Sequence, residues 1–209
     1  MTPYYEQDGI TIYHGDCREI LPTFPDRSFD LVLTDPPYGI GRDGQRVSTG
    51  GHGGRKGYEF RGWDSSIPPP EVFDEMRRVS TEQIIWGGQY FAHLLPPAPA
   101  WLVWDKGQRI NQSDGELAYK SNGGALRIFT LNRVALMTDG AVHPTQKPLD
   151  LIKWCIGMGE TASILDPFMG SGTTLVAAKQ LGRKAVGIEI EEKYCEMAVK
   201  RLAQMELFS

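Results

Sequence analysis

The sequence predicts an α/β protein whose sheet is mainly parallel, and three observations support this fold class. Short apolar runs rich in β-branched residues alternate with segments of helical periodicity, a pattern typical of repeated βα units. Two of the apolar runs lead directly into unusual polar or glycine-containing turns. With 209 residues and 41% hydrophobic content, the chain is long enough for one sizeable core and short for two. We therefore expect one domain over residues 1–209.

Seven strands and four helices are predicted in this alternation. The strands are short apolar runs at residues 10–14, 29–34, 83–87, 100–104, 125–131, 162–165 and 184–190. The helices cover residues 70–79, 148–158, 173–181 and 192–205. The last helix places Tyr194, Ala198, Arg201 and Leu202 at helical spacing, which indicates an amphipathic packing face.

Two segments interrupt the alternation. Residues 39–62 hold nine of the 24 glycines, and their five basic residues outnumber two acidic ones. Such a composition indicates a flexible basic loop, and long loops in compact domains are usually functional or disordered. The second segment, residues 105–141, is rich in polar and basic side chains.

Composition limits the classes of protein to consider. The formal net charge is −4, yet the basic segment 39–62 allows one positive face on an acidic protein. The amino terminus resembles no signal peptide and no apolar run approaches a membrane span, so we expect a cytoplasmic protein. Cys17, Cys155 and Cys195 form no CxxC pair, and the histidines lack metal spacing, so no disulfide and no metal site are predicted.

The first unusual turn is Asp35-Pro36-Pro37-Tyr38, which directly follows the predicted strand 29–34. It combines a carboxylate, two rigid prolines and an aromatic ring at the end of a strand. A Pro-rich turn that closes a buried strand explains these residues equally well. Taken alone, the tetrapeptide therefore leaves a structural turn and an active site both open.

The second turn is Asp166-Pro167-Phe168-Met169-Gly170-Ser171-Gly172, which lies between a predicted strand and a predicted helix. Its glycines let the backbone approach a ligand, and the amino terminus of the following helix offers free N–H groups. Glu189 ends the next strand, at the spacing where an acidic side chain accepts hydrogen bonds from ribose hydroxyls. The turn is neither GxGxxG nor a P-loop, which argues against dinucleotide and nucleoside triphosphate sites.

These two turns together make the chain resemble the amino-methylating DNA methyltransferases, which use S-adenosylmethionine to modify adenine N6 or cytosine N4. Asp35-Pro36-Pro37-Tyr38 matches the catalytic motif of that family, and residues 166–172 match its cofactor motif. The catalytic motif comes first, an order similar to the β class, and small phage and prophage enzymes look closest. The resemblance implies a circularly permuted Rossmann-like fold with a mainly parallel seven-stranded sheet.

The resemblance also implies a set of cofactor contacts. Glu189 is expected to bind the ribose hydroxyls, Asp16 the adenine amino group, and the Cys17 backbone N–H a ring nitrogen. Thr145 and Lys147 lie in a segment similar to the one that precedes the methionine-binding helix, although a Pro-bounded turn before a helix explains them too. The remaining residues expected to surround S-adenosylmethionine are Asp166, Phe168, Gly170, Ser171, Gly172, Thr173 and Thr174.

The expected chemistry follows from the conjugated, poorly nucleophilic exocyclic amine of a base. Asp35 and the Pro36 carbonyl would accept hydrogen bonds from the amine and localise its lone pair, while Pro37 keeps the turn rigid. The methyl group is then expected to move by direct in-line attack. Tyr38 would stack on a base that has been rotated out of the duplex. None of the three cysteines follows a proline, which argues against cytosine C5 chemistry.

The resemblance favours site-specific methylation of adenine N6 in DNA, because the motif begins with Asp. Cytosine N4 methylation is the first alternative, and a catalytically silent DNA- or cofactor-binding module is the second. Residues 105–141 are the expected target-recognition insertion. DNA is the expected partner, a homodimer is a candidate assembly, and a bacterial or phage-infected cell is the expected setting. The predicted nucleic-acid contacts are Arg46, Arg55, Lys56, Arg61, Lys106, Arg109 and Lys120.

Overall fold

The computed structural model describes residues 1–41, 64–107, 113–132 and 146–204. In this part of the chain the strands are β1 (Tyr5–Gln7), β2 (Ile10–His14), β3 (Phe29–Thr34), β4 (Ser80–Trp86), β5 (Ala100–Asp105), β6 (Gly115–Lys120), β7 (Arg127–Thr130), β8 (Ser163–Asp166) and β9 (Lys184–Glu189). The α-helices are α1 (Cys17–Ile20), α2 (Pro70–Val79), α4 (Leu149–Ile156), α5 (Thr173–Gln180) and α6 (Glu192–Gln204). Two short 3₁₀ helices, η1 (Leu21–Thr23) and η2 (Gly88–Tyr90), complete the elements.

The described strands form one nine-stranded mixed sheet, in the order β1-β2-β9-β8-β3-β4-β6-β5-β7. The predicted count of seven strands is therefore wrong. The seven predicted strands all run in one direction, while the two unpredicted strands, β1 and β6, run antiparallel to their neighbours. β1 arises because Asp8 and Gly9, both at positive φ, fold the chain back onto β2. β6 inserts between β4 and β5 and pairs with both.

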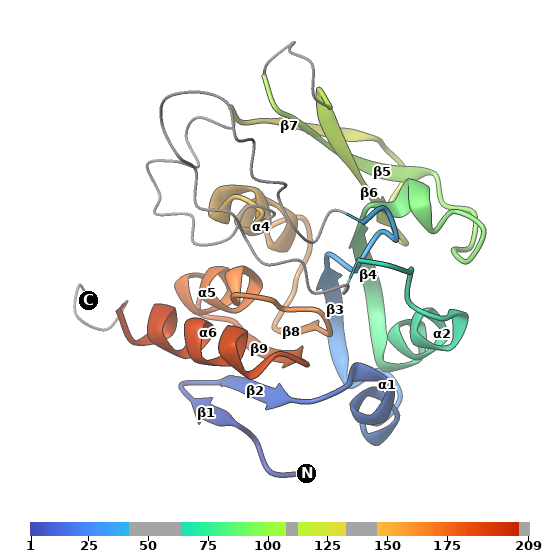
Figure 1. Cartoon of the computed structure of the whole chain (residues 1–209). Helices are drawn as coiled ribbons and strands as arrows, with labels where there is room; N and C mark the ends of the chain where they lie inside the picture. The colour runs from blue at the N-terminus through green and yellow to red at the C-terminus, as the bar shows by residue number, and fades with distance from the viewer. Residues whose placement is uncertain (42–63, 108–112, 133–145, 205–209) are drawn as a thin grey trace, which may run out of the picture.

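Helices cover both faces of the sheet, as Figure 1 shows. α4, α5 and α6 pack on one face, where Leu31 and Leu33 of β3 point, and α1 and α2 pack on the other, which receives Val32. This alternation follows from the two-residue period of a strand that is buried on both sides. Both cores are continuous along the sheet, which makes its carboxyl-terminal edge a rigid platform. No helix within the described ranges combines the length and apolarity needed to cross a membrane.

β3 and β8 lie side by side, although they are far apart in sequence. Their ladder holds only two Cα pairs, Leu31 with Ile164 and Val32 with Leu165. At the amino-terminal end of β3, the Asp30 carboxylate accepts hydrogen bonds from the backbone N–H groups of Ala162 and Ser163, each at 2.9 Å. The Ser163 hydroxyl donates to the same carboxylate oxygen at 3.0 Å. Polar bonds thus supplement a short ladder at the joint between the two halves of the sheet.

Candidate active site

The candidate site lies where the direction of chain progression across the sheet reverses. From β3 the chain crosses through α2 to β4 on one side, and from β8 it crosses through α5 to β9 on the other. Such a switch point opens a crevice at the carboxyl ends of the strands. Asp35 directly follows β3 and Asp166 ends β8, so both unusual turns meet at this crevice.

A mainly apolar cavity occupies the crevice and contacts both turns. From the predicted site residues it is lined by Asp35, Pro37, Lys147, Asp166, Phe168, Gly170, Ser171, Thr173, Thr174 and Glu189. The other lining residues are Leu33, Thr34, Trp86, Gln146, Ile152, Met169, Ile190, Glu191 and Tyr194. Three of these had a sequence signal: Met169 lies within the cofactor-like turn, and Ile190 and Glu191 directly follow the acidic residue that ends β9.

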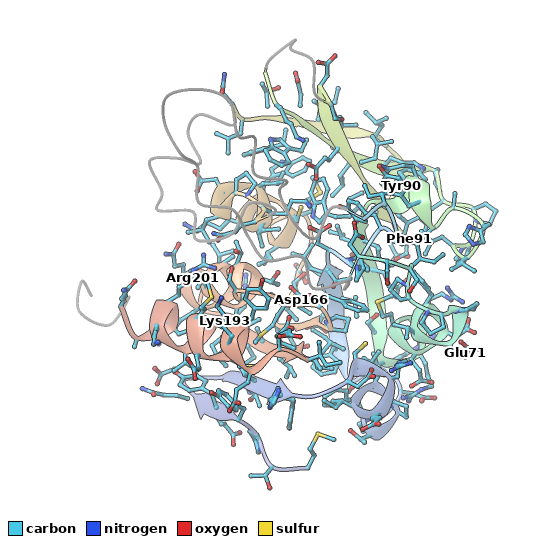
Figure 2. All side chains as sticks on the ribbon, viewed as in Figure 1. Glu71, Tyr90, Phe91, Asp166, Lys193 and Arg201 are labelled. Carbon is cyan, nitrogen blue, oxygen red and sulfur yellow. The ribbon has the colours of Figure 1, made fainter. Side chains whose placement is uncertain are left out.

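Asp166 is buried at the centre of the site, where Figure 2 labels it. The Thr34 hydroxyl donates to its Oδ1 at 2.7 Å, across the joint between β3 and β8. The Phe168 N–H donates to the same oxygen at 3.1 Å and closes the turn. Burial raises the pKa of this carboxyl to about 6, against the lowering effect of these hydrogen bonds and one from Thr174.

The two glycines of the cofactor-like turn serve different purposes. Gly170 (φ +50°) has no heavy atom within 4 Å of the position that a Cβ would take, so this side of the turn is open. At Gly172 (φ +80°) a Cβ would lie 2.7 Å from the Cβ of Ala198 on α6. Gly172 therefore permits close packing of α6, whereas Gly170 permits the turn and leaves space beside the cavity.

Glu189 forms the opposite wall and is held by backbone donors. The Gly170 N–H donates to its Oε2 at 3.0 Å, and the Glu191 N–H donates to its Oε1 at 2.8 Å. Each oxygen keeps a further lone pair for a ligand donor. Burial raises the pKa of Glu189 to about 7, and the backbone hydrogen bonds from Glu191 and Gly170 oppose this rise only in part.

Arg201 is a residue of the site that the sequence assigned to packing. It reaches from α6, as Figure 2 shows, and its Nη1 donates to the Ser171 carbonyl at 2.7 Å. The same nitrogen lies within hydrogen-bond distance of the hydroxyls of Ser171 at 3.2 Å and Thr173 at 3.1 Å. Arg201 therefore fixes the turn that α5 begins from.

Tyr38 brings an aromatic group to Asp35. Its hydroxyl donates to Asp35 Oδ1, and its ring stacks on Tyr90 with centroids 4.8 Å apart and an interplanar angle of 20°. Gly87 directly follows β4 and has a φ of +73°. A Cβ at this position would lie 2.1 Å from Tyr38 Cε1. The ring thus occupies the space that a side chain at position 87 would need. Pro36 and Tyr38 border the acceptor side without lining the cavity.

Asp64 is a second residue that sequence reasoning missed. Its buried Oδ1 accepts hydrogen bonds from the backbone N–H groups of Tyr38 at 2.7 Å and Gly39 at 2.8 Å. It therefore fixes the backbone directly after the acceptor motif. The long segment between Gly39 and Asp64 hides this pairing from the sequence.

A chain of ion pairs surrounds Asp35. Lys147 Nζ contacts Asp35 Oδ2 and lies 3.0 Å from Glu116 Oε2, while Lys106 Nζ lies 2.7 Å from Glu116 Oε1. Burial raises the pKa of Asp35 and Lys147 opposes the rise. Although burial also acts on Glu116, the two lysines lower its pKa to about 2. Glu116 had no motif to reveal it, since it begins the unpredicted strand β6.

Two other predicted residues, Asp16 and Cys17, do not line the cavity. Asp16 caps α1 by accepting the Arg18 N–H at 2.9 Å, and Arg18 also binds its carboxylate. Cys17 begins the same helix, and burial raises the pKa of its thiol to about 12, so the thiolate is disfavoured. Gly15 donates to the Glu189 carbonyl at 2.9 Å, which ties this turn to the end of β9. The adenine contacts expected at Asp16 and Cys17 stay predictions.

The two described lysines that were predicted to contact nucleic acid are both paired with carboxylates. Lys106 is 6% exposed and binds Glu116, and Lys120 pairs with Glu82. A phosphate would have to compete with these carboxylates, so the arrangement does not favour the role predicted for either lysine. The other predictions fall outside the described residues: Arg46, Arg55, Lys56, Arg61 and Arg109 for nucleic acid, and Thr145 for the cofactor.

The described part of the predicted insertion 105–141 contains β6 and β7, which belong to the main sheet. Of the predicted loop 39–62, only residues 39–41 are described. The described residues contain no group of three or more His, Cys, Asp or Glu side chains that could hold a metal ion.

Comparisons with known proteins identify similar DNA methyltransferases. Residues 100–200 match the DNA methylase family N6_N4_Mtase. The type II methyltransferase M.ScaI of Streptomyces caespitosus is 28% identical, and the alignment covers 96% of this chain and 83% of the relative. M.HinfI of Haemophilus influenzae is also 28% identical, with 94% of this chain and 69% of the relative covered. These similarities support an amino-methylating DNA methyltransferase.

Solved structures show the same fold. The M1.HpyAVI–SAM complex has a TM-score of 0.63 at 24% identity and covers 92% of this chain and 99% of its own. The cytosine-N4-specific PvuII DNA methyltransferase has a TM-score of 0.64 at 16% identity, with 95% and 88% covered. The fold is therefore that of DNA methyltransferases.

Proposed function

We propose that this protein transfers a methyl group from S-adenosylmethionine to the N6 amine of an adenine that has been rotated out of DNA. The observation that carries the proposal is the position of Asp35. Its carboxylate lines the same cavity as Gly170 and Glu189, at the switch point of the sheet. An acceptor for an amine and a site for a nucleoside-containing cofactor therefore share one space.

The residues present fit the cofactor. Glu189 keeps two lone pairs for ribose hydroxyls, and Phe168 and Ile190 offer apolar surface to a planar ring. The open side of Gly170 leaves room for a ligand, and the Trp86 N–H has no acceptor among the described residues. When bound, S-adenosylmethionine supplies an activated methyl group on a sulfonium.

The acceptor half of the site acts on the base. Asp35 is a hydrogen-bond acceptor that orients the amine and localises its lone pair, as the sequence chemistry expects. The Pro36 carbonyl is proposed as the second acceptor, and the Tyr38 ring, stacked on Tyr90, as a surface for the base. The basic residues Arg46, Arg55, Lys56 and Arg61 complete the proposal as phosphate contacts.

A second candidate is methylation of cytosine N4. It is favoured by the likeness to the PvuII enzyme, whose fold matches this chain with a TM-score of 0.64. The initial Asp of the acceptor motif favours adenine. Both candidates use the same acceptor chemistry on an exocyclic amine, so only the product separates them.

The test is methyl transfer to unmethylated DNA, followed by nucleoside analysis and mapping of the modified positions. We expect N6-methyladenine from the wild type. Asp35→Ala should lower the rate by roughly a hundredfold to a thousandfold, because removing one aimed hydrogen-bonding group from a preorganised site costs about that much. Its affinity for S-adenosylmethionine should stay within about twofold of wild type, since Asp35 makes no bond to Glu189 or the glycine turn.

Glu71→Gln is the control, because Glu71 is exposed on α2 and Figure 2 labels it far from Asp166. Glu71→Gln should retain both methyl transfer and affinity for S-adenosylmethionine. N4-methylcytosine as the product would replace the adenine assignment by the second candidate. Cofactor binding without any methylated product would support a silent binding module instead.

A further inference from the structure

Glu116 is the one member of the ion chain beside Asp35 that was not among the predicted site residues. It lies at the beginning of β6, which runs antiparallel to β4 and so brings its first residues to the carboxyl-terminal edge of the sheet. Its neighbours Lys106 and Lys147 are nearly covered, each with 8% of its side chain exposed. Burying this group of charges is unfavourable unless each charge is compensated, so its retention beside Asp35 calls for a role.

The geometry places Lys147 between two carboxylates that compete for it. Its Nζ hydrogen bonds to Asp35 Oδ2 and lies 3.0 Å from Glu116 Oε2. The buried Oε2 of Glu116 receives no hydrogen bond of good angular geometry among the described residues, although Lys147 is close enough to lower the pKa of Glu116. Glu116 thus offers Lys147 a second carboxylate within reach. Lys106 holds the other oxygen of Glu116 at 2.7 Å.

Both oxygens of Asp35 already receive a donor in this arrangement. Tyr38 donates to Oδ1 and Lys147 donates to Oδ2. An ammonium on the carboxylate favours its ionised form, but it also competes with an incoming amine for Oδ2, although that oxygen keeps a further lone pair. A cation that moves a short distance toward Glu116 would weaken this competition and stay near enough to stabilise the negative charge.

We infer that Glu116 is a positioning residue that draws Lys147 away from Asp35 when the target amine enters, with Lys106 holding Glu116 in place. This inference rests on the proposed function, because the amine is the ligand that Asp35 receives. Lys147 acts on the amine through Asp35, and Glu116 acts through Lys147.

Each charge near Asp35 contributes to its pKa with a defined sign. Burial raises it, Lys147 lowers it and Glu116 raises it, while the hydrogen bond from Tyr38 lowers it. Asp166, on β8, is the other carboxylate that interacts with Asp35. Neutralising Glu116 should therefore commit Lys147 to Asp35 and lower its pKa, whereas removing Lys147 should raise it.

The test is the pH dependence of single-turnover methyl transfer, measured for the wild type, Glu116→Gln, Lys147→Met and Lys106→Met. In Glu116→Gln the maximal rate should fall by about tenfold, and the acid limb should move to lower pH by roughly half a unit or more. In Lys147→Met the acid limb should move to higher pH. Lys106→Met should move it in the same direction by less, because unopposed Glu116 draws Lys147 from Asp35.

Glu71→Gln and Lys193→Met are matched controls at exposed positions and should leave the profile unchanged. Thermal unfolding and S-adenosylmethionine affinity establish that each variant is folded. If Glu116 has only a structural role, Glu116→Gln should reduce the amount of folded protein and leave the acid limb of the pH profile unchanged. That result, or a shift of the limb in the same direction for Glu116→Gln and Lys147→Met, would overturn the inference.

A second readout separates this inference from the proposed function. The Asp35 carboxyl carbon can be titrated by ¹³C NMR in the protein without DNA. Its pKa should fall in Glu116→Gln and rise in Lys147→Met. If the wild type transfers no methyl group, the proposed function fails, but this titration still measures the coupling. An unchanged pKa in both variants would refute the coupling even in an active enzyme.

Discussion

The two halves of the active site hold their carboxylates by different means. In the cofactor half, Glu189 and Asp166 receive backbone N–H groups and a hydroxyl, and burial raises their pKa values to about 7 and about 6. In the acceptor half, Asp35 and Glu116 receive the ammonium groups of Lys147 and Lys106. The cofactor half is thus fixed by the fold of the backbone, and the acceptor half by long side chains that can move.

This difference suits the two tasks proposed for the halves. A cofactor of constant shape binds best to a preorganised surface, so rigid turns are an advantage. A base that enters from DNA must replace contacts already made within the site. Flexible side chains allow that exchange without reorganising the sheet.

Among substitutions outside the polar groups of the site, the largest effect is expected at Gly87, which supports the acceptor half. In Gly87→Ala the new Cβ would collide with Tyr38 and displace the ring from Tyr90 and Asp35. Single-turnover methyl transfer should fall by roughly a hundredfold, as expected of a small misplacement of reacting groups. Affinity for S-adenosylmethionine, measured by calorimetry, should change by less than about twofold.

Gly182→Ala is the matched control for the backbone effect. Gly182 also has a positive φ, +65°, but no heavy atom lies within 4 Å of its Cβ position. Gly182→Ala should introduce the same kind of backbone strain, because alanine disfavours a positive φ, and should retain methyl transfer. An equal loss of cofactor affinity in Gly87→Ala would mean that the two halves are not independent.

A smaller effect is expected at Glu189 and depends on pH. If the ionised carboxylate binds the ribose, affinity should increase by about tenfold between pH 6 and pH 8, because its pKa is about 7. Glu189→Gln should bind more weakly and lose this dependence. Adenosine is the better ligand for the measurement, since it has the ribose hydroxyls and no titrating amino group.

The same group should affect stability with the opposite sign. The pKa of Glu189 is raised from 4.5 to about 7 on folding, so its contribution to stability is complete below pH 4.5 and is lost as the pH rises to about 7. Glu189→Gln should therefore gain stability relative to wild type between these values in chemical unfolding. A constant difference between the two proteins would show that burial does not raise this pKa.

The smallest effect is expected at Arg201. Arg201→Met removes the donor shared by Ser171 and Thr173, and the turn should become less ordered. A loss of about fivefold in cofactor affinity follows from a net hydrogen-bond contribution of about 1 kcal/mol. Lys193→Met, an exposed substitution on the same helix, should leave the affinity unchanged. If both variants weaken binding equally, Arg201 contributes only to the general stability of α6.

Most of the fold could be predicted from the sequence, because the local hydrophobic pattern of most elements matches their burial in the structure. β2, β3 and α2 have the predicted bounds, since their apolar periodicity matches the faces they bury. β1 carried a signal in the Asp8-Gly9 turn, but three residues are too few for an alternating pattern. β6 is polar at its first residues and is stabilised by pairing with two strands distant in sequence, so no local pattern specifies it.

The site follows the same division. Asp35, Gly170 and Glu189 were predicted because their chemistry lies within short motifs at strand ends. Glu116 and Arg201 were not assigned to it, since their roles depend on partners that only the tertiary fold brings near. For Lys106, likewise, the sequence shows a positive charge but does not show the Glu116 carboxylate with which it forms an ion pair.

Asp30 fixes the register between β3 and β8 at their amino-terminal ends, opposite the end where the cavity lies. A slip of one residue at this joint would shift Asp35 against Asp166 by about 3.3 Å and turn their side chains to the opposite faces. The three bonds from Ala162 and Ser163 hold the register at one end, and the bond from Thr34 to Asp166 holds it at the other. The proposed alignment of the methyl acceptor with the cofactor thus depends partly on Asp30, which lies one strand length away and does not line the cavity.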